Sequence, residues 1–149
     1  MLLYRGLRGS RLHGFATPQS DWDWLEVHDK IKTRGTNRGG EDLLRCNLTD
    51  FVKWAEDGNH TALENIFAPD WAVEVDMIRA WRYAFVPNLA NVRRVYTRTI
   101  RNFRERGDLK RLRHADRMEY DLDCVMRTGR FDPTAYARVC NSSGRVPGF

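Results

Sequence analysis

Two aspartates near the start of the chain have the spacing of metal ligands. In the stretch "GSRLHGFATPQSDWDW", Asp21 and Asp23 are separated by one residue. Side chains alternate along an extended segment, so both carboxylates share one face while Trp22 and Trp24 take the other, where we expect them to pack on helices. Like charges on one face repel unless a cation lies between them. Mg²⁺ prefers such oxygen ligands and lets phosphates complete its coordination shell. A metal site and a solvated strand face are the two alternatives.

A Gly-Ser pair precedes the aspartates and has the composition of a phosphate-binding turn. Gly9 supplies backbone freedom, and Ser10 supplies a hydroxyl beside exposed amide groups that can hold phosphate oxygens. The next residue, Arg11, could also reach a phosphate. Gly-Ser pairs are common in ordinary turns. The carboxylates that follow this pair are what favour a phosphate-binding role for it.

Length, composition and charge predict one globular domain with an anionic partner. The chain has 149 residues, of which 42% are hydrophobic, and it contains five Trp. The net charge is +5, and the excess is local: residues 93–117 hold ten Lys or Arg against three acids, a net +7. Such a segment suits a nucleotide or RNA, and a solvated helix face is the alternative.

The cysteines and the hydropathy favour a reducing compartment. Three cysteines are widely spaced and form no metal-ligand pattern, which is typical of reduced thiols. The apolar run at the N-terminus is too short for a signal peptide, and no stretch is long and apolar enough to span a bilayer. We therefore expect a cytoplasmic protein without membrane attachment.

The elements that must position these residues begin with a small sheet. Residues 1–7 and 21–27 are predicted strands, and residues 42–48 form a third strand that pairs with the second. Residues 28–40 are rich in Gly and basic side chains and are predicted to form a mobile loop. This loop either closes over an anionic ligand or serves as a plain linker.

Helical patterns follow the sheet and define an α+β fold class. Thr49 and Thr61 are the expected N-caps of the first two helices, and Asp70 opens the third. The predicted helices cover residues 50–58, 62–68, 70–85, 88–107 and 108–129. The domain is expected over residues 1–131, with the sheet in about 1–48, the helices in 49–131 and a loosely attached tail at 132–149.

Three segments resemble a known family. "GSRLHGFATPQSDWDW", "EDLLRCNLTDFVKWAEDGNHTALENIFAP" and "KRLRHADRMEYDLDCVMRTG" are similar to successive segments of the DNA polymerase β-like nucleotidyltransferase superfamily, closest to the stand-alone predicted nucleotidyltransferases of bacteria and phages. The resemblance covers roughly residues 4–130. It implies the fold of that superfamily and a location in the cytoplasm of a bacterium or of a phage-infected host.

The resemblance also implies a third carboxylate on a neighbouring strand. Asp42 fits this position, because it begins the strand expected beside Asp21 and Asp23. Glu41 is the competing choice, and strand alternation lets only one of the two face the metals. We favour Asp42.

The chemistry that the resemblance implies is metal-assisted nucleotidyl transfer. Two Mg²⁺, for which Mn²⁺ can substitute, would be held by Asp21, Asp23 and Asp42. NMP would pass from an NTP, by default ATP, to a hydroxyl of an unknown acceptor such as RNA or a protein. Gly9 and Ser10 would hold the β and γ phosphates, and Asp42 could serve as the base.

One basic helix face is a further candidate for nucleotide binding. Lys110, His114 and Arg117 lie at i, i+4 and i+7, so they line one side of the last predicted helix and could meet a triphosphate. A solvated basic face is the alternative. His13 and His28 show no partner pattern and are interpreted as loop residues.

The chain departs from its relatives in two places, and two other functions stay open. Arg8 stands where relatives more often have a hydrophobic residue, and His60 stands where they favour Pro. An antitoxin-like or nucleotide-sensing binding module would keep the fold with little turnover. A basic helical nucleic-acid binder would ignore the acids and show strongly salt-dependent binding.

Overall fold

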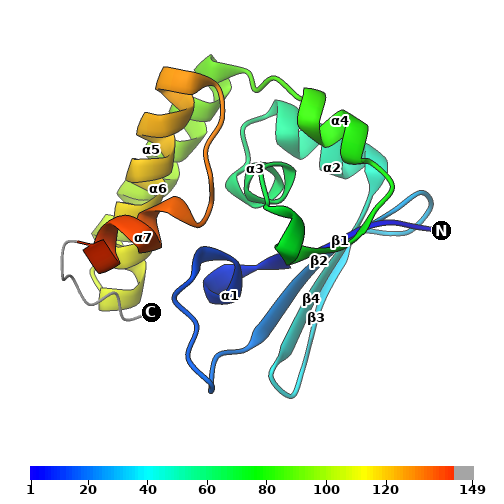
Figure 1. Cartoon of the computed structure of the whole chain (residues 1–149), viewed down its shortest axis with the longest axis horizontal. Coiled ribbons are helices and arrows are strands. Elements are labelled where there is room, and N and C mark those ends of the chain that lie inside the picture. Colours follow the sequence, from blue (N-terminus) through cyan, green and yellow to red (C-terminus); the bar gives the residue numbers. More distant parts are fainter. Residues whose placement is uncertain (143–149) are drawn as a thin grey trace.

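A computed structural model describes residues 1–142 and shows an α+β protein, in which a mixed sheet of five strands precedes a largely helical part (Figure 1). The strands are β1 (Leu2–Arg8), β2 (Trp22–His28), β3 (Arg34–Arg38), β4 (Glu41–Asn47) and β5 (Val73–Asp76). They lie in the order β3-β4-β2-β1-β5. β4 is parallel to β2, whereas the other neighbours are antiparallel. The expected fold class is confirmed.

The segment predicted as a loop over residues 28–40 contains a strand. β3 pairs antiparallel with β4, so the chain runs from β2 out to the edge of the sheet and returns beside β2. The turn between β3 and β4 is made by Gly39 and Gly40, both at positive φ. β3 is polar and mostly exposed, as edge strands often are, and therefore lacks the apolar alternation by which a strand is detected.

Apart from a short one after β1, the helices follow β4. They are α1 (Gly9–His13), α2 (Leu48–Glu56), α3 (His60–Ile66), α4 (Arg79–Ala84), α5 (Leu89–Arg106), α6 (Leu109–Thr128) and α7 (Ala135–Ser142). Of these, α2 and α3 precede the edge strand β5. Four of the five predicted helices are confirmed as α2, α3, α5 and α6. The predicted caps Thr49 and Thr61 are wrong, because the side chains of Asn47 and Asn59 accept the backbone N–H groups and start each helix earlier.

The predicted helix over residues 70–85 is wrong in its first half. A 3₁₀ turn, η1 (Asp70–Ala72), leads into β5, which pairs with the free edge of β1, and only then does α4 begin. The β-branched Val73 and Val75 alternate with acids and suit an extended edge strand better than a helix. The helical spacing of apolar residues over the whole segment 70–85 hid the alternation of apolar and acidic residues in its first half.

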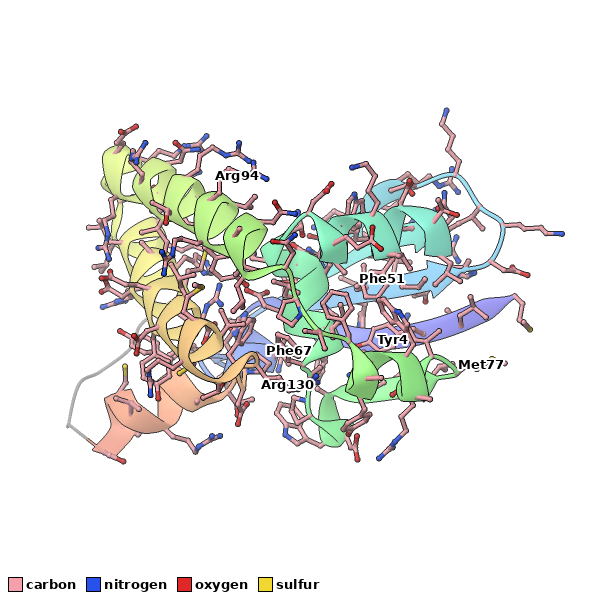
Figure 2. All side chains as sticks on the ribbon, turned by 90° about the horizontal axis from the view of Figure 1, so that it is seen from above. Tyr4, Phe51, Phe67, Met77, Arg94 and Arg130 are labelled. Atoms are coloured by element: carbon pink, nitrogen blue, oxygen red, sulfur yellow. The ribbon has the colours of Figure 1, made fainter. Side chains whose placement is uncertain are left out.

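The main core lies between one face of the sheet and the helices. Tyr4 of β1 stacks on Phe51 of α2 with ring centroids 6.2 Å apart, and Figure 2 shows both rings beneath α2. The α5–α6 pair contributes Val92 and Met118 to this same core. Because one apolar cluster spans both parts, the helical pair is anchored to the sheet layer.

The opposite face of the sheet is only partly covered. Trp24 is buried in a small cluster with Leu7 and Leu12, as a packed side chain should be. Trp22, by contrast, keeps 47% of its surface exposed and lies under the guanidinium of Arg11, 3.8 Å from its ring centroid. The expectation that both tryptophans pack on helices is therefore wrong for Trp22.

The C-terminal segment is better attached than expected. α7 buries Ala137 and Cys140 and contacts α1 and α6, so the part of the predicted tail up to residue 142 is a packed helix. Residues 143–149 of that tail lie outside the described residues. Within residues 1–142, no helix combines the length and the apolar character needed to cross a bilayer.

Candidate functional site

The register of β2 and β4 places two carboxylates side by side. Asp23 of β2 is paired with Asp42 of β4, and paired residues of parallel strands project from the same face. Asp21 lies two residues before Asp23 and continues that row. Glu41 is paired with Trp22, and its carboxylate lies 3.7 Å from Arg5. Of the two alternatives, the structure brings Asp42 beside Asp23.

Gly9 lies directly against this row of carboxylates. It follows β1, whose last residue Arg8 is paired with Asp23, and it opens α1 with φ +65°. A Cβ on Gly9 would lie 2.4 Å from Oδ2 of Asp23, closer than van der Waals contact allows. Glycine is therefore required both by the backbone conformation and by the space beside Asp23. Ser10 follows in the first turn of α1.

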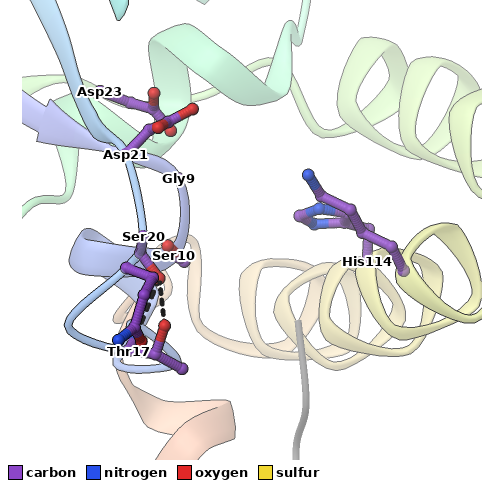
Figure 3. Close-up of a pocket in the computed structure, with 9 residues that line it drawn as sticks. Gly9, Ser10, Thr17, Ser20, Asp21, Asp23 and His114 are labelled. Carbon is purple, nitrogen blue, oxygen red and sulfur yellow. Dashed lines mark hydrogen bonds between the residues drawn. The ribbon is translucent and has the colours of Figure 1, made fainter. Parts of the chain in front are cut away.

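A pocket of about 330 Å³ is lined by Asp21 and Asp23 but not by Asp42. Figure 3 shows Asp21 and Asp23 on one wall and His114 on the opposite wall. The loop before β2 closes a third side, where the backbone N–H of Thr17 donates to Oγ of Ser20 at 2.8 Å. The lining residues are Gly9, Ser10, Thr17, Gln19, Ser20, Asp21, Asp23, Lys110 and His114. Residues from three separate parts of the chain thus meet around one polar space.

The carboxylates interact through charge. Burial raises the pKa of Asp23 above its ordinary value, and the negative charges of Asp42 and Asp21 raise it further, whereas Arg8 and Lys110 act in the opposite direction. The structure therefore holds an unfavourable concentration of negative charge at Asp23. A cation placed between the carboxylates would relieve it.

The α6 wall carries one charged and one neutral group. Lys110 is exposed at the mouth of the pocket. Burial lowers the pKa of His114 to about 4, and the nearby Arg117 adds to the effect, so the imidazole is neutral at pH 7. This wall offers one positive charge and one neutral imidazole rather than the uniformly basic face that the sequence suggests.

Two predicted phosphate-binding residues are engaged elsewhere. Arg117 is only 2% exposed, and its guanidinium donates to Glu64 at 2.8 Å and to Asp121 at 3.1 Å. Arg11 donates to the backbone carbonyl of Ser20 at 2.7 Å while its guanidinium covers Trp22. Neither side chain lines the pocket of Asp21 and Asp23. Both guanidinium groups are instead bound by other groups of the protein.

Sequence reasoning misplaced two histidines, neither of which lines the pocket of Asp21 and Asp23. His13 is a buried helical residue, not a loop residue: its Nδ1 lies 2.9 Å from the carbonyl of Pro133 and its Nε2 lies 3.4 Å from Glu64. His28 ends β2 with Nε2 3.0 Å from Glu26. Burial of this kind depends on tertiary contacts with distant segments, so no local signal marks His13.

Arg8 is a further residue that sequence reasoning missed at the carboxylates, and its position could have been found. It ends β1 next to the Gly-Ser turn, and its Nη2 lies 3.4 Å from Oδ2 of Asp42. Extending the alternation of β1 from the buried Tyr4 through Gly6 places Arg8 on the face of the carboxylates.

The donor set suits a divalent cation of the magnesium type. Three carboxylates supply hard oxygen ligands. The pKa of Asp23 is raised, chiefly by burial, and the charges of Asp42 and Asp21 add to the shift while Arg8 opposes it. In their present positions, however, no three His, Cys, Asp or Glu side chains of residues 1–142 are gathered closely enough to enclose a metal ion. The residues fit the cation chemically, and Asp42 is already paired with Arg8.

Comparison with protein-family models and with curated proteins gives no match to this chain.

Proposed function

We propose that the protein is a metal-dependent nucleotidyltransferase of the DNA polymerase β-like kind, which transfers NMP from an NTP to a hydroxyl acceptor. One observation carries the proposal: Asp23 and Asp42 are paired on adjacent strands, and Asp21 and Asp23 line a pocket that also contains Ser10 and Lys110. This arrangement combines carboxylates for a cation with donors for phosphate. The similarity of three sequence segments to that superfamily agrees with it.

Asp21, Asp23 and Asp42 would hold Mg²⁺, or Mn²⁺ in its place. A divalent cation supplies charge neutralisation at the phosphates and lowers the pKa of a bound hydroxyl. The Asp42 carboxylate lies at the end of the row farthest from the Gly-Ser turn, since β4 is farther from β1 than β2 is. Asp42 would be the group that accepts the proton of the acceptor hydroxyl.

The remaining residues bind and orient the nucleotide. The Ser10 hydroxyl and the amide groups of the turn at Gly9 would donate to phosphate oxygens. Lys110 faces them from α6 and would balance the charge of the triphosphate. The neutral His114 can donate or accept a hydrogen bond without adding charge. Catalysis in this scheme rests on positioning and on electrostatic stabilisation.

The test uses NTPs labelled at the α-phosphate, with Mg²⁺ and with or without RNA. We expect transfer of label and release of pyrophosphate. Asp21→Asn and Asp23→Asn each remove a ligand charge while keeping the shape, so without metal both variants should melt at or above the parent temperature. Both should lose transfer and the rise in melting temperature that Mn²⁺ gives the parent, and so should Asp42→Asn.

Glu41→Gln is the matched control, because this carboxylate is 55% exposed and lies beside Arg5 rather than beside Asp23. It should retain transfer and metal stabilisation. Absence of transfer with every NTP and acceptor would contradict the proposal, and so would an Asp21→Asn variant that melts far below the parent without metal.

A second function is favoured by the ion pair of Arg8 and Asp42. An arginine that neutralises the third carboxylate suits a nucleotide-binding module with little turnover, of the sensing or antitoxin-like type. Such a module would bind an NTP tightly enough to be detected by calorimetry while releasing no pyrophosphate. The transfer assay separates the two functions, because an enzyme releases pyrophosphate stoichiometrically with label transfer.

A further inference from the structure

Arg8 occupies the position of a cation among the carboxylates. Its side chain starts on β1, and β2 lies between β1 and β4, so the guanidinium must extend across the β2 strand to reach Asp42. Nη2 lies 3.4 Å from Oδ2 of Asp42, and Nε donates to the carbonyl of Trp24 at 3.3 Å. The side chain of Arg8 is 21% exposed and that of Asp42 is 40% exposed. The contact is partly shielded from water.

The position of Arg8 relative to Asp23 strengthens this interpretation. The two residues are paired in the antiparallel ladder of β1 and β2, and Asp23 is itself paired with Asp42. One guanidinium therefore lies near both paired carboxylates. A divalent cation that binds Asp23 and Asp42 together needs the same region of space and the same negative charge.

We propose that Arg8 is a resident counter-ion that competes with the divalent cation for Asp42 and is displaced when the cation binds. The inference rests on the proposed function, because it assumes that these carboxylates hold a metal. Displacement requires room for the guanidinium. A second pocket of about 190 Å³ beside Gly9 is lined by Arg8, His60, Glu64 and other residues and offers that room.

Competition has a direct energetic consequence. The free energy of the Arg8–Asp42 ion pair is lost when the cation takes Asp42, so it is subtracted from the free energy of metal binding. The affinity for a free cation is therefore lower than the carboxylates alone would give. Removing the guanidinium should strengthen binding of the bare cation, the reverse of what is expected for a residue that supports a binding site.

The experiment measures binding of Mn²⁺ alone, from the paramagnetic signal of free Mn²⁺ during titration, with no nucleotide present. Arg8→Met keeps much of the side-chain length and removes the charge. We expect its Kd for Mn²⁺ to fall by roughly three- to fivefold relative to the parent, in line with a partly shielded ion pair. Arg8→Lys keeps a charge that can still pair with Asp42, so its Kd should lie between the two.

Arg45→Met is the matched control for the change in net charge. Arg45 lies on β4 like Asp42, but its guanidinium contacts Glu26 at 3.2 Å on the other face of the sheet, and its side chain is 41% exposed. Its Kd for Mn²⁺ should stay within about twofold of the parent, because exposed charges at a distance are screened. Circular dichroism spectra check that each variant is folded, and Arg8→Lys serves if Arg8→Met does not fold.

The outcomes separate this inference from the proposed function. If Arg8→Met binds Mn²⁺ no better than the parent while the parent still transfers label, the competition is absent and the function stands. An equal gain in Arg45→Met would show a general charge effect and would also overturn the inference. If neither the parent nor Arg8→Met binds Mn²⁺ and no transfer occurs, both the inference and the proposed function fail.

Discussion

At the scale of single residues, Gly9 couples the backbone turn to the position of a carboxylate. Gly9→Ala should destabilise the fold by about 1–2 kcal/mol for the positive φ, with an additional cost from the contact with Asp23. The Asp23 carboxylate must move to make room for the methyl group. Urea unfolding and Mn²⁺ titration together should show loss of stability and weaker metal binding.

Gly107→Ala is the control for the conformational part of that cost. Gly107 has φ +72° and no atom within 4 Å of the position of a Cβ, so its substitution carries only the backbone penalty. The difference in unfolding free energy between the two variants reports the clash at Asp23. Equal losses in both variants, with unchanged Mn²⁺ binding, would show that the Asp23 side chain makes room for the methyl group without any cost in stability or in metal binding.

A second residue, Asp121, predicts a pH dependence of stability. Burial raises its pKa from 3.8 to about 8, although Arg117 opposes the shift. The folded state therefore keeps a proton that the unfolded chain releases at about pH 4. Stability from this group should fall by several kcal/mol as the pH rises from about 4 to about 8, and stay low above that range.

Asp121→Asn should remove this part of the pH dependence, because the amide has no proton to lose. Urea unfolding at pH 5 and at pH 8 provides the measurement. Asp123→Asn is the control on the same helix, since the Asp123 side chain is 67% exposed and pairs with Arg127. A parent protein whose stability does not fall between these two pH values would contradict the assignment of a protonated Asp121.

At the scale of elements, Glu64 joins three helices. It lies on α3, accepts from Arg117 of α6 at 2.8 Å, and has His13 of α1 at 3.4 Å. Burial raises the pKa of the Glu64 carboxyl, but Arg117 and His13 outweigh it and hold the pKa well below its ordinary value. The ionised carboxylate thereby fixes α6, and with it the wall of the pocket that carries Lys110.

Glu64→Gln should leave the buried Arg117 without its main counter-charge and cost about 3–5 kcal/mol in the free energy of unfolding. Glu119→Gln is the control, because the 65% exposed Glu119 pairs with the exposed Arg104 and should cost less than about 1 kcal/mol. Both values come from urea unfolding followed by circular dichroism. Similar losses in the two variants would mean that Asp121 compensates Arg117 in the absence of Glu64.

A helix or strand could be predicted from the sequence where its own residues carry the pattern of that element. β1 and β2 are short segments rich in apolar and aromatic residues, and α5 and α6 each end at a glycine in the left-handed conformation. β3 and β5 were missed because both are edge strands whose residues gain stability from a neighbouring strand rather than from burial of an apolar face. Two helices begin earlier than predicted because the side chains of Asn47 and Asn59, rather than those of the threonines two residues later, accept the first free backbone N–H groups.

The candidate site, too, could be predicted only where its residues lie close together in the sequence. Asp21, Asp23, Gly9 and Ser10 are close in the sequence: strand alternation related the two aspartates, and the resemblance added the Gly-Ser pair. Asp42 also required the register of β2 with β4, which the sequence left open between two neighbouring acids. Arg117 was misjudged because nothing local reveals that Glu64, on another helix, contacts it.

At the scale of the whole molecule, the three thiols lie in regions of different stability. Cys46 is fully buried on β4, and burial raises its pKa to about 12. Cys140 is 2% exposed on α7, which packs on α1 and α6 from the end of the described chain. Cys124 of α6 is half-buried. A thiol reagent should therefore modify Cys124 first, then Cys140, and Cys46 last.

The measurement is the rate of modification of each cysteine at low urea concentrations, read by mass spectrometry of peptides. Cys46 should react only at the rate of global unfolding, whereas Cys140 should react faster because detaching one terminal helix is enough to expose it. Identical rates and identical urea dependence for Cys46 and Cys140 would show that α7 unfolds only with the rest of the protein.

The opposing walls of the pocket also have a consequence for biosynthesis. Asp21, Asp23 and Ser10 leave the ribosome before Lys110 and His114, which are added roughly ninety to a hundred residues later. A nascent chain that has completed only the sheet carries the acidic row without the lysine that faces it. In the proposed function, a nucleotide would contact both walls only after α6 has emerged, so its binding would not guide the earlier steps of folding and the sheet would form without that help.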